Sequence, residues 1–203
     1  MATETLLSDP SKNPESTREV DETVLARLRA GEIAALDELF AVYGDRVFGV
    51  CLGILAHHAD AEDATQEVFL RAFEQAARFS ARSRFSTWLL RLTANHTLNL
   101  AKARGRRRRL DEPMAEGIAS TSPPPDRGVI QRERRDELAR HLQKLSVERR
   151  QVLILREMEG LSYTELAEVL DVPIGTVTSR LIRARQQLRG LMHDFRSDTP
   201  EPG

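Results

Sequence analysis

The chain has 203 residues, with 30 Lys and Arg against 31 Asp and Glu, so its formal net charge is −1. This near-balance argues against a uniformly basic nucleic-acid binder, although local basic surfaces can coexist with it. Its one cysteine, Cys51, excludes an intrachain disulfide and a cysteine-rich zinc site, and the 5% aromatic content disfavours an all-β sandwich or barrel.

The N-terminal segment, residues 1–20, is polar and acidic, and we interpret it as a disordered leader. It has neither the basic start nor the apolar stretch of a signal peptide. No apolar run approaches the roughly 20 residues that cross a bilayer. We therefore expect no membrane insertion and a cytoplasmic location.

Residues 21–110 show helical spacing of apolar residues and no strand-like alternation. One pattern begins at Val24 and ends at Phe40, with a break at Gly31. The others cover 47–55, 60–79 and 85–103. The sequence therefore predicts a first domain of about four helices.

The third of these helices carries an acidic face. Asp63, Glu67 and Leu70 follow one another at helical spacing, and Gln66 lies beside them. Such a face is either solvated or binds a basic partner, and the spacing alone leaves both interpretations open.

Residues 75–110 contain ten Lys and Arg and no acid. Phe79, Phe85 and Trp88 are interleaved with these bases. A solvated basic tail is one interpretation. The other is a surface for single-stranded nucleic acid, because bases stack on flat side chains and phosphates attract cations.

Residues 111–130 are rich in Pro, Gly and Ser and contain few large apolar groups, which predicts a flexible linker. Helical periodicity returns over 131–195 and leaves a tail at 196–203. The predicted fold class is all-α, with two small helical domains joined by the linker.

Capping signals divide the second domain into short helices. Ser146 is placed to cap a helix that ends before Gly160. Ser162 and Glu165 have the spacing of a capping box, and Pro173 suits the first turn of a further helix. The spacing predicts two helices joined by a tight turn.

The last predicted helix runs over 174–191. Its apolar stripe consists of Val177, Leu181, Ala184 and Leu188. The other side carries hydroxyl and basic groups: Thr176, Thr178, Ser179, Arg180, Ile182, Arg183 and Gln186. A plain helical hairpin could look like this, but the capping box, the short turn and the polar face favour a helix-turn-helix that reads the DNA major groove.

No pattern in the sequence favours catalysis or a cofactor. His57 and His58 are adjacent, so on a helix they would point about 100° apart. There is no His-Glu-x-x-His spacing, no nucleophile elbow and no phosphate-binding glycine loop. We therefore expect no metal, no cofactor and no enzyme activity.

Three motifs carry a resemblance to a known family. They are Asp63-Ala-Thr-Gln-Glu-Val-Phe-Leu-Arg-Ala-Phe73, Phe85-Ser-Thr-Trp-Leu-Leu-Arg-Leu-Thr-Ala-Asn95, and the segment from Leu161 to Arg185. In this order and spacing, over about residues 22–195, they resemble the extracytoplasmic-function (ECF) sigma factors of the bacterial sigma-70 family. This resemblance implies a subunit that brings core RNA polymerase to promoters.

The resemblance implies a role for each surface. Residues 21–110 correspond to sigma region 2, which docks on the β′ clamp and captures the minus-ten element, and 131–195 to region 4, which reads the minus-thirty-five element. The implied docking residues are Asp63, Gln66, Glu67 and Leu70. The implied minus-ten residues are Phe79, Arg84, Phe85, Thr87, Trp88, Arg91 and Asn95. The implied minus-thirty-five residues are Thr176, Thr178, Ser179, Arg180, Ile182 and Arg183.

The resemblance also implies further partners. These are the β flap of the polymerase, promoter DNA in double- and single-stranded form, and an anti-sigma factor that holds the protein inactive until a stress releases it. The loop Phe79-Ser80-Ala81-Arg82-Ser83 lacks the glycine and the acid that family members often carry there. Thr178 stands where the family often has Lys or Arg.

Two other functions compete with this interpretation. A decoy with a sigma-like fold could sequester an anti-sigma protein, but decoys usually lose the DNA-facing residues that this chain retains. An autonomous helix-turn-helix repressor would bind duplex DNA without polymerase, and it leaves the acidic face unexplained.

Overall fold

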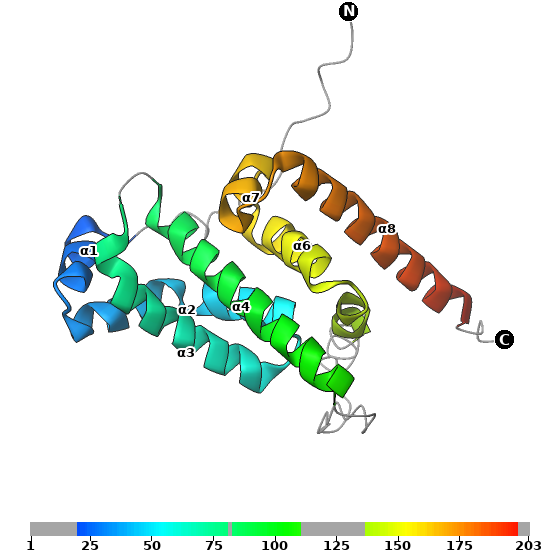
Figure 1. Cartoon of the computed structure of the whole chain (residues 1–203), viewed down its shortest axis with the longest axis horizontal. Coiled ribbons are helices and arrows are strands. Elements are labelled where there is room, and N and C mark those ends of the chain that lie inside the picture. The colour runs from blue at the N-terminus through cyan, green and yellow to red at the C-terminus, as the bar shows by residue number, and fades with distance from the viewer. Residues whose placement is uncertain (1–19, 81–82, 111–136, 199–203) are drawn as a thin grey trace, which may run out of the picture.

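The computed structural model describes residues 20–80, 83–110 and 137–198, and in these ranges it contains helices and no strand (Figure 1). The elements are α1 (Glu22–Arg29), α2 (Ile33–Leu55), α3 (His58–Gln75), the 3-10 turn η2 (Ala76–Arg78), α4 (Phe85–Leu110), α6 (Val147–Glu159), α7 (Tyr163–Leu170) and α8 (Ile174–Asp198). Residues 137–143 are also helical. The leader 1–19, the segment 111–136 and the end 199–203 lie outside the described residues.

The first four helices form the N-terminal domain, and their number, though not their division, agrees with the prediction. Asp21 caps α1 by accepting a hydrogen bond from the Thr23 backbone N–H, and the chain turns at Gly31 with a φ of 82°. The expected second pattern is not a separate helix. It continues the first, because α2 runs without a break for 23 residues.

The core of this domain lies where α2, α3 and α4 meet. Tyr43, Val47 and Cys51 of α2 are almost completely buried there. The predicted inner side of α3, Ala61, Ala64, Val68 and Ala72, is at most 1% exposed. Two residues of the first apolar pattern are exposed rather than buried in this core: Ile33 is 73% and Phe40 48% exposed.

The C-terminal domain has the caps that the sequence predicts. Ser146 accepts a hydrogen bond from the Arg149 backbone N–H, and Gly160 ends α6 in the left-handed conformation with a φ of 64°. Ser162 and Glu165 form a complete capping box at the start of α7. In α8, Val177, Leu181 and Ala184 are at most 1% exposed and pack toward α6 and α7. The helix-turn-helix is therefore confirmed.

The two domains pack directly against each other, with α2 and α4 of the first facing α6 and α7 of the second. Figure 1 shows α6 and α7 beside the middle of α4. Val50, Ile54, Leu90 and Ala94 belong to the same buried cluster as the apolar residues of α6, α7 and α8. This contact is an addition to the expected pair of tethered domains. Of the described helices, none is long and apolar enough to span a membrane.

Candidate protein and nucleic-acid interfaces

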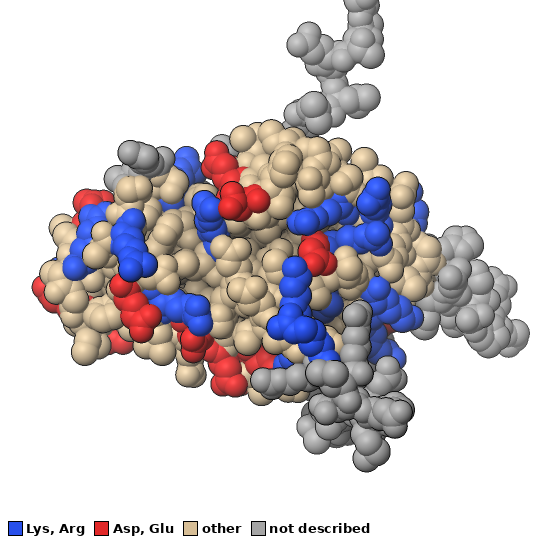
Figure 2. Space-filling view, in the orientation of Figure 1, with Lys and Arg blue, Asp and Glu red and all other residues tan. Residues whose placement is uncertain are grey.

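The acidic face of α3 is exposed over its whole length. Asp63, Gln66, Glu67 and Leu70 are all exposed, and Leu70 keeps 53% of its surface open. Glu67 forms an ion pair with Arg71 one turn later, with a nitrogen–oxygen distance of 3.0 Å. Figure 2 shows acidic side chains gathered along the edge of the molecule that α3 forms. The structure thus brings the four predicted docking residues onto one surface.

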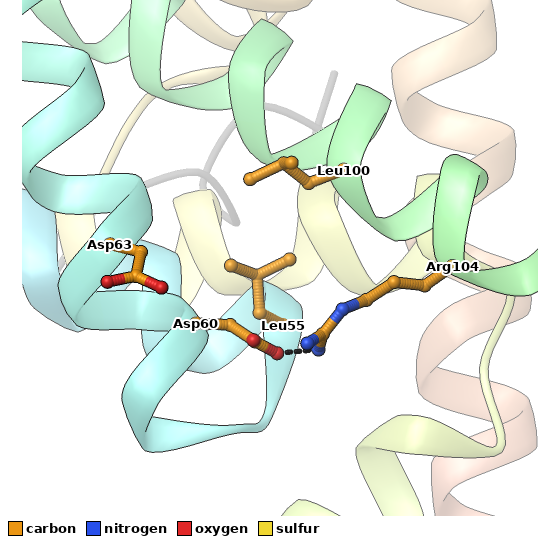
Figure 3. Close-up of a pocket in the computed structure, with 5 residues that line it drawn as sticks. All are labelled: Leu55, Asp60, Asp63, Leu100 and Arg104. Carbon is orange, nitrogen blue, oxygen red and sulfur yellow. Dashed lines mark ion pairs between the residues drawn. The ribbon is translucent and has the colours of Figure 1, made fainter.

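A shallow pocket of about 220 Å³ adjoins this face between α3 and the C-terminal half of α4 (Figure 3). It is lined by Leu55, Asp60, Asp63, Leu100 and Arg104. Within the pocket, Arg104 of the basic stretch 75–110 forms an ion pair with Asp60, so the charge of this carboxylate is already neutralised. Asp63 lies at the outer side, where it joins the acidic face.

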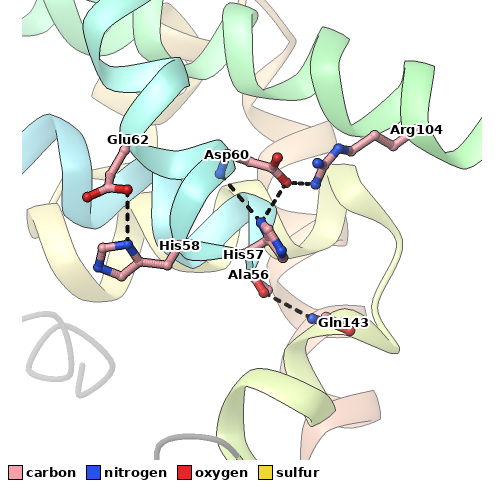
Figure 4. Close-up of polar contacts among 7 residues, drawn as sticks. All are labelled: Ala56, His57, His58, Asp60, Glu62, Arg104 and Gln143. Atoms are coloured by element: carbon pink, nitrogen blue, oxygen red, sulfur yellow. Dashed lines mark hydrogen bonds and ion pairs between the residues drawn. The ribbon is translucent and has the colours of Figure 1, made fainter. Parts of the chain in front are cut away.

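The two adjacent histidines have structural roles at the start of α3 (Figure 4). His57 caps the helix by accepting a hydrogen bond from the Asp60 backbone N–H, and its Nδ1 lies 3.2 Å from the Asp60 carboxylate. The Nδ1 atom of His58 lies 3.3 Å from the Oε2 atom of Glu62. In the described ranges no group of three His, Cys, Asp or Glu side chains is arranged to hold a metal ion.

The predicted aromatic residues of the minus-ten surface form a packed cluster. The ring centroid of Trp88 lies 5.2 Å from that of Phe85 and 5.4 Å from that of Phe79. Phe85 is 3% and Phe79 8% exposed, and the Arg29 guanidinium lies 5.5 Å from the Phe79 centroid. These two phenylalanines are therefore core residues beneath Trp88, which is half-buried.

Polar members of the same prediction lie at Arg84, directly before α4, and along one face of that helix. Arg84, Arg91 and Asn95 are exposed, and Thr87 is half-buried between them. Arg91 follows Arg84 by about two helical turns, and Asn95 follows Arg91 by about one. The three side chains therefore lie along one side of the helix. Arg91 forms an ion pair, because its guanidinium lies 3.3 Å from the carboxylate of Asp171 in the turn before α8.

On α8 the predicted DNA-reading residues differ in how accessible they are. Ile182 and Arg183 are exposed, whereas Thr176, Thr178, Ser179 and Arg180 are half-buried. The Thr178 hydroxyl donates to the Ile174 carbonyl and the Ser179 hydroxyl to the Thr176 carbonyl. These hydroxyls keep lone pairs free to accept, but their protons already serve the helix backbone.

Arg180 faces the neighbouring helices as well as the outer side of α8. Burial would raise the pKa of Glu148 on α6, but Lys102 and Arg180 hold that pKa below its ordinary value. Lys102 lies on α4, and its Nζ is 3.0 Å from Glu148. Figure 2 shows Lys and Arg side chains gathered over this half of the molecule, with an acidic group among them.

Known protein families match both domains of the chain. The family described as "Sigma-70 region 2" matches residues 39–107, and "Sigma-70, region 4" matches residues 135–188. The RNA polymerase sigma-H factor of Pseudomonas aeruginosa is 32% identical, over 85% of this chain and 93% of that protein. The ECF RNA polymerase sigma factor SigE of Mycolicibacterium smegmatis is 34% identical, over 95% of this chain and 74% of that protein. The chain belongs to the ECF sigma factors of the sigma-70 family.

A solved structure supports the fold of this sigma factor. The sigma factor RpoE of Bartonella quintana, in complex with the anti-sigma factor NepR, superposes with a TM-score of 0.61 at 22% identity. The match covers 77% of this chain and 96% of that one. The matches to region 2 (39–107) and region 4 (135–188) fall in the N-terminal and the C-terminal domain, respectively.

The sequence did not identify the residues that join regions 2 and 4 of this sigma factor. They are Arg46, Gly49 and Gly53 on α2 and Arg150, Gln151, Ile154 and Glu159 on α6. One signal was available, since two glycines four residues apart inside an apolar helical pattern indicate a close approach. The charged members gave no signal, because nothing local distinguishes them from surface residues.

Proposed function

We propose that this sigma factor docks on the β′ clamp of core RNA polymerase through the exposed face of α3. One observation carries the proposal: Leu70 is 53% exposed beside Glu67, Gln66 and Asp63. A large apolar side chain among carboxylates suits a partner that offers both basic groups and apolar surface. The negative charge would also speed the encounter with a basic partner.

The N-terminal half of α4 is proposed to capture the minus-ten element. Trp88 offers a half-buried ring on which a base can stack, and the buried Phe85 holds it in place. Arg84 and Arg91 would meet phosphates, and the exposed Asn95 amide can pair with a base edge. In this proposal Phe79 and Phe85 position Trp88 from the core rather than stack on bases themselves.

The recognition helix α8 is proposed to read the minus-thirty-five element in the major groove. Arg183 and Ile182 are exposed enough to reach base edges and methyl groups. Thr176, Thr178, Ser179 and Arg180 lie at the margin of that face, where phosphate contacts suit them better.

Regulation and location follow the same proposal. The Bartonella quintana neighbour was solved with an anti-sigma factor, and we expect a comparable stress-controlled partner here. The protein would act with the polymerase in the cytoplasm, with the β flap as a second docking site for the C-terminal domain. It would need no cofactor and would catalyse no reaction of its own.

Transcription with purified components tests this function. The chain is added to core RNA polymerase on fragmented genomic DNA, and the run-off transcripts are sequenced; a reaction without the chain is the control. We expect transcripts that share two sequence elements upstream of their starts. If the chain bound duplex DNA tightly by itself but produced no transcripts with core enzyme, an autonomous repressor would replace this proposal.

A further inference from the structure

Two isoleucines of the recognition helix α8 are exposed, although the apolar stripe of this helix is buried. Ile174 keeps 49% and Ile182 51% of its surface open, whereas Val177 and Leu181, which lie between them in the sequence, are at most 1% exposed. Eight positions separate the two isoleucines, which places them ~12 Å apart along the helix axis. They therefore do not belong to the core of the C-terminal domain.

The surface between the two isoleucines carries small side chains and no free side-chain proton. Thr178 lies four positions from each isoleucine, and its hydroxyl donates to the Ile174 carbonyl at 3.0 Å. A Cβ at Gly175 would have nothing within 4 Å, so the start of the helix is open to a ligand. Helical residues four positions apart lie next to one another, so we call Ile174, Thr178 and Ile182 the apolar row.

The charge around the apolar row suits nucleic acid as its ligand. Residues 174–191 contain four Arg and no Asp or Glu. Arg183, which directly follows Ile182, is exposed. Figure 1 shows α8 along the outside of the molecule, where a long ligand can approach it. Phosphates are attracted to such a face, so the row lies where DNA would bind.

The chemistry of the row selects one group among the base edges. In the major groove thymine alone presents a methyl group, and the other features of the four bases are hydrogen-bond donors and acceptors. An isoleucine side chain forms no hydrogen bond, so a methyl group is the partner that it can distinguish. Isoleucine is also branched at Cβ and has one preferred rotamer in a helix, so binding fixes little that was free.

We propose that the apolar row reads the 5-methyl groups of thymines in the minus-thirty-five element. This inference rests on the proposed function, because it takes α8 to lie in the major groove. Ile174, the first residue of α8, thereby becomes a DNA contact, as is usual for the start of a recognition helix. At 3.4 Å per base pair, ~12 Å corresponds to about three to four pairs, so the two isoleucines contact different thymines.

Replacing thymine by deoxyuridine tests the contact, because uracil lacks only the 5-methyl group. Holoenzyme is titrated with a promoter found in the transcription experiment, and each thymine of its minus-thirty-five element, on either strand, is replaced in turn. We expect two replacements to weaken binding by about fourfold each, which corresponds to ~0.8 kcal/mol for one buried methyl group. An element without thymine, or equal binding of every duplex, would overturn the inference.

Substitutions in the row assign each methyl group to a side chain. Ile182→Ala should abolish the effect of one deoxyuridine and Ile174→Ala the effect of the other, because a methyl group without a partner contributes nothing when it is removed. Both side chains are exposed, so neither substitution opens a cavity in the core. Met192→Ala, which alters a 50% exposed side chain of the same helix outside the row, is the control and should keep both effects. Deoxyuridine effects that persist in both isoleucine variants would assign the methyl groups to another part of the protein.

Failure of this inference differs from failure of the proposed function. A holoenzyme that requires the minus-thirty-five element but binds thymine and deoxyuridine duplexes equally would overturn methyl reading and leave the proposed function intact. A holoenzyme whose binding is unchanged when the whole element is scrambled would overturn the proposed role of α8, and the reading of thymine with it. The scrambled duplex is therefore measured beside the deoxyuridine set.

Discussion

Arg46 on α2 and Glu159 at the end of α6 form an ion pair between the two domains, although 113 residues separate them along the chain. Burial raises the pKa of the Glu159 carboxyl, and Arg46 offsets part of that rise. The net pKa stays above its ordinary value of 4.5. The packed arrangement of the two domains therefore binds this proton more tightly than an arrangement in which the domains are apart and the carboxyl is hydrated.

The first prediction concerns pH. Because the pKa of Glu159 is raised when the domains are packed, its protonation stabilises the contact between them at low pH. This stabilisation is lost as the pH rises through the raised pKa. Arg46→Ala removes the offset and raises the pKa of Glu159 further, so raising the pH should separate the domains of this variant more readily than those of the native chain. Energy transfer between dyes attached at Asn99→Cys on α4 and Arg189→Cys on α8, both exposed positions, measures the separation of the domains.

Glu159→Gln supplies the matched control for that titration. An amide side chain cannot ionise, so this substitution should remove the dependence on pH in the Arg46→Ala background. The Arg46→Ala chain is compared directly with the chain that carries both substitutions and the same dyes. An unchanged titration in the double variant would assign the effect to another group.

The second prediction concerns polymerase docking. Glu67→Lys reverses an exposed charge in the middle of the acidic face, so affinity for core polymerase should fall by more than about tenfold, because close interfacial charge pairs are coupled by ~1.5–7 kcal/mol. Glu62→Lys, exposed on the same helix but outside the proposed docking set, is the control. Anisotropy titrations with core enzyme measure both. Equal losses in the two variants would point to net charge rather than to a docking face.

The third prediction concerns the recognition helix. Arg183→Ala should weaken binding of the minus-thirty-five element by about 1–3 kcal/mol and relax the preference at one base pair, if the guanidinium reads a base edge. Arg189→Ala, also exposed on α8, serves as the control. Holoenzyme binding to a set of single-base promoter variants gives both numbers. A uniform loss across all variants would mean that Arg183 meets a phosphate.

The fourth prediction concerns the start of α7. Ser162→Ala removes the side chain that accepts from the Glu165 backbone N–H at 3.2 Å, and should cost about 1 kcal/mol of stability. Thr164→Ala, exposed two residues later, lacks this cap and should change little. Thermal unfolding followed by circular dichroism compares them. If both variants lost the same stability, the cap would not explain the loss.

Features set by neighbouring residues could be predicted from the sequence. The Ser146 cap and the Ser162–Glu165 box depend on side chains within four positions of the backbone groups that they satisfy. Gly160 ends α6 because a glycine adopts the left-handed conformation without strain. The exposed face of α3 follows from the same helical spacing. These rules act locally, so they need no knowledge of the tertiary fold.

Features set by distant parts of the chain could not be predicted in this way. The burial of Phe85 depends on Tyr43, whose ring centroid lies 5.9 Å away and which comes 42 positions earlier. The sequence suggested that Phe79, Phe85 and Trp88 stack on bases, whereas the fold buries the rings of Phe79 and Phe85 in the core. The interdomain contact was missed for the same reason, because glycines that allow a close approach and hydrogen bonds between domains become meaningful only when the partner helix is known.

The helix α2 contributes residues to two hydrophobic cores, which has a consequence for how the protein unfolds on heating. Cys51 lies in the core that α2 shares with α3 and α4, whereas Val50 and Ile54 lie in the core that it shares with α6 and the helix-turn-helix. One helix thus forms a wall of both cores. Heat cannot unfold either core without exposing part of the other, so calorimetry should record a single cooperative endotherm for the native chain and two for a chain in which the domains have been separated.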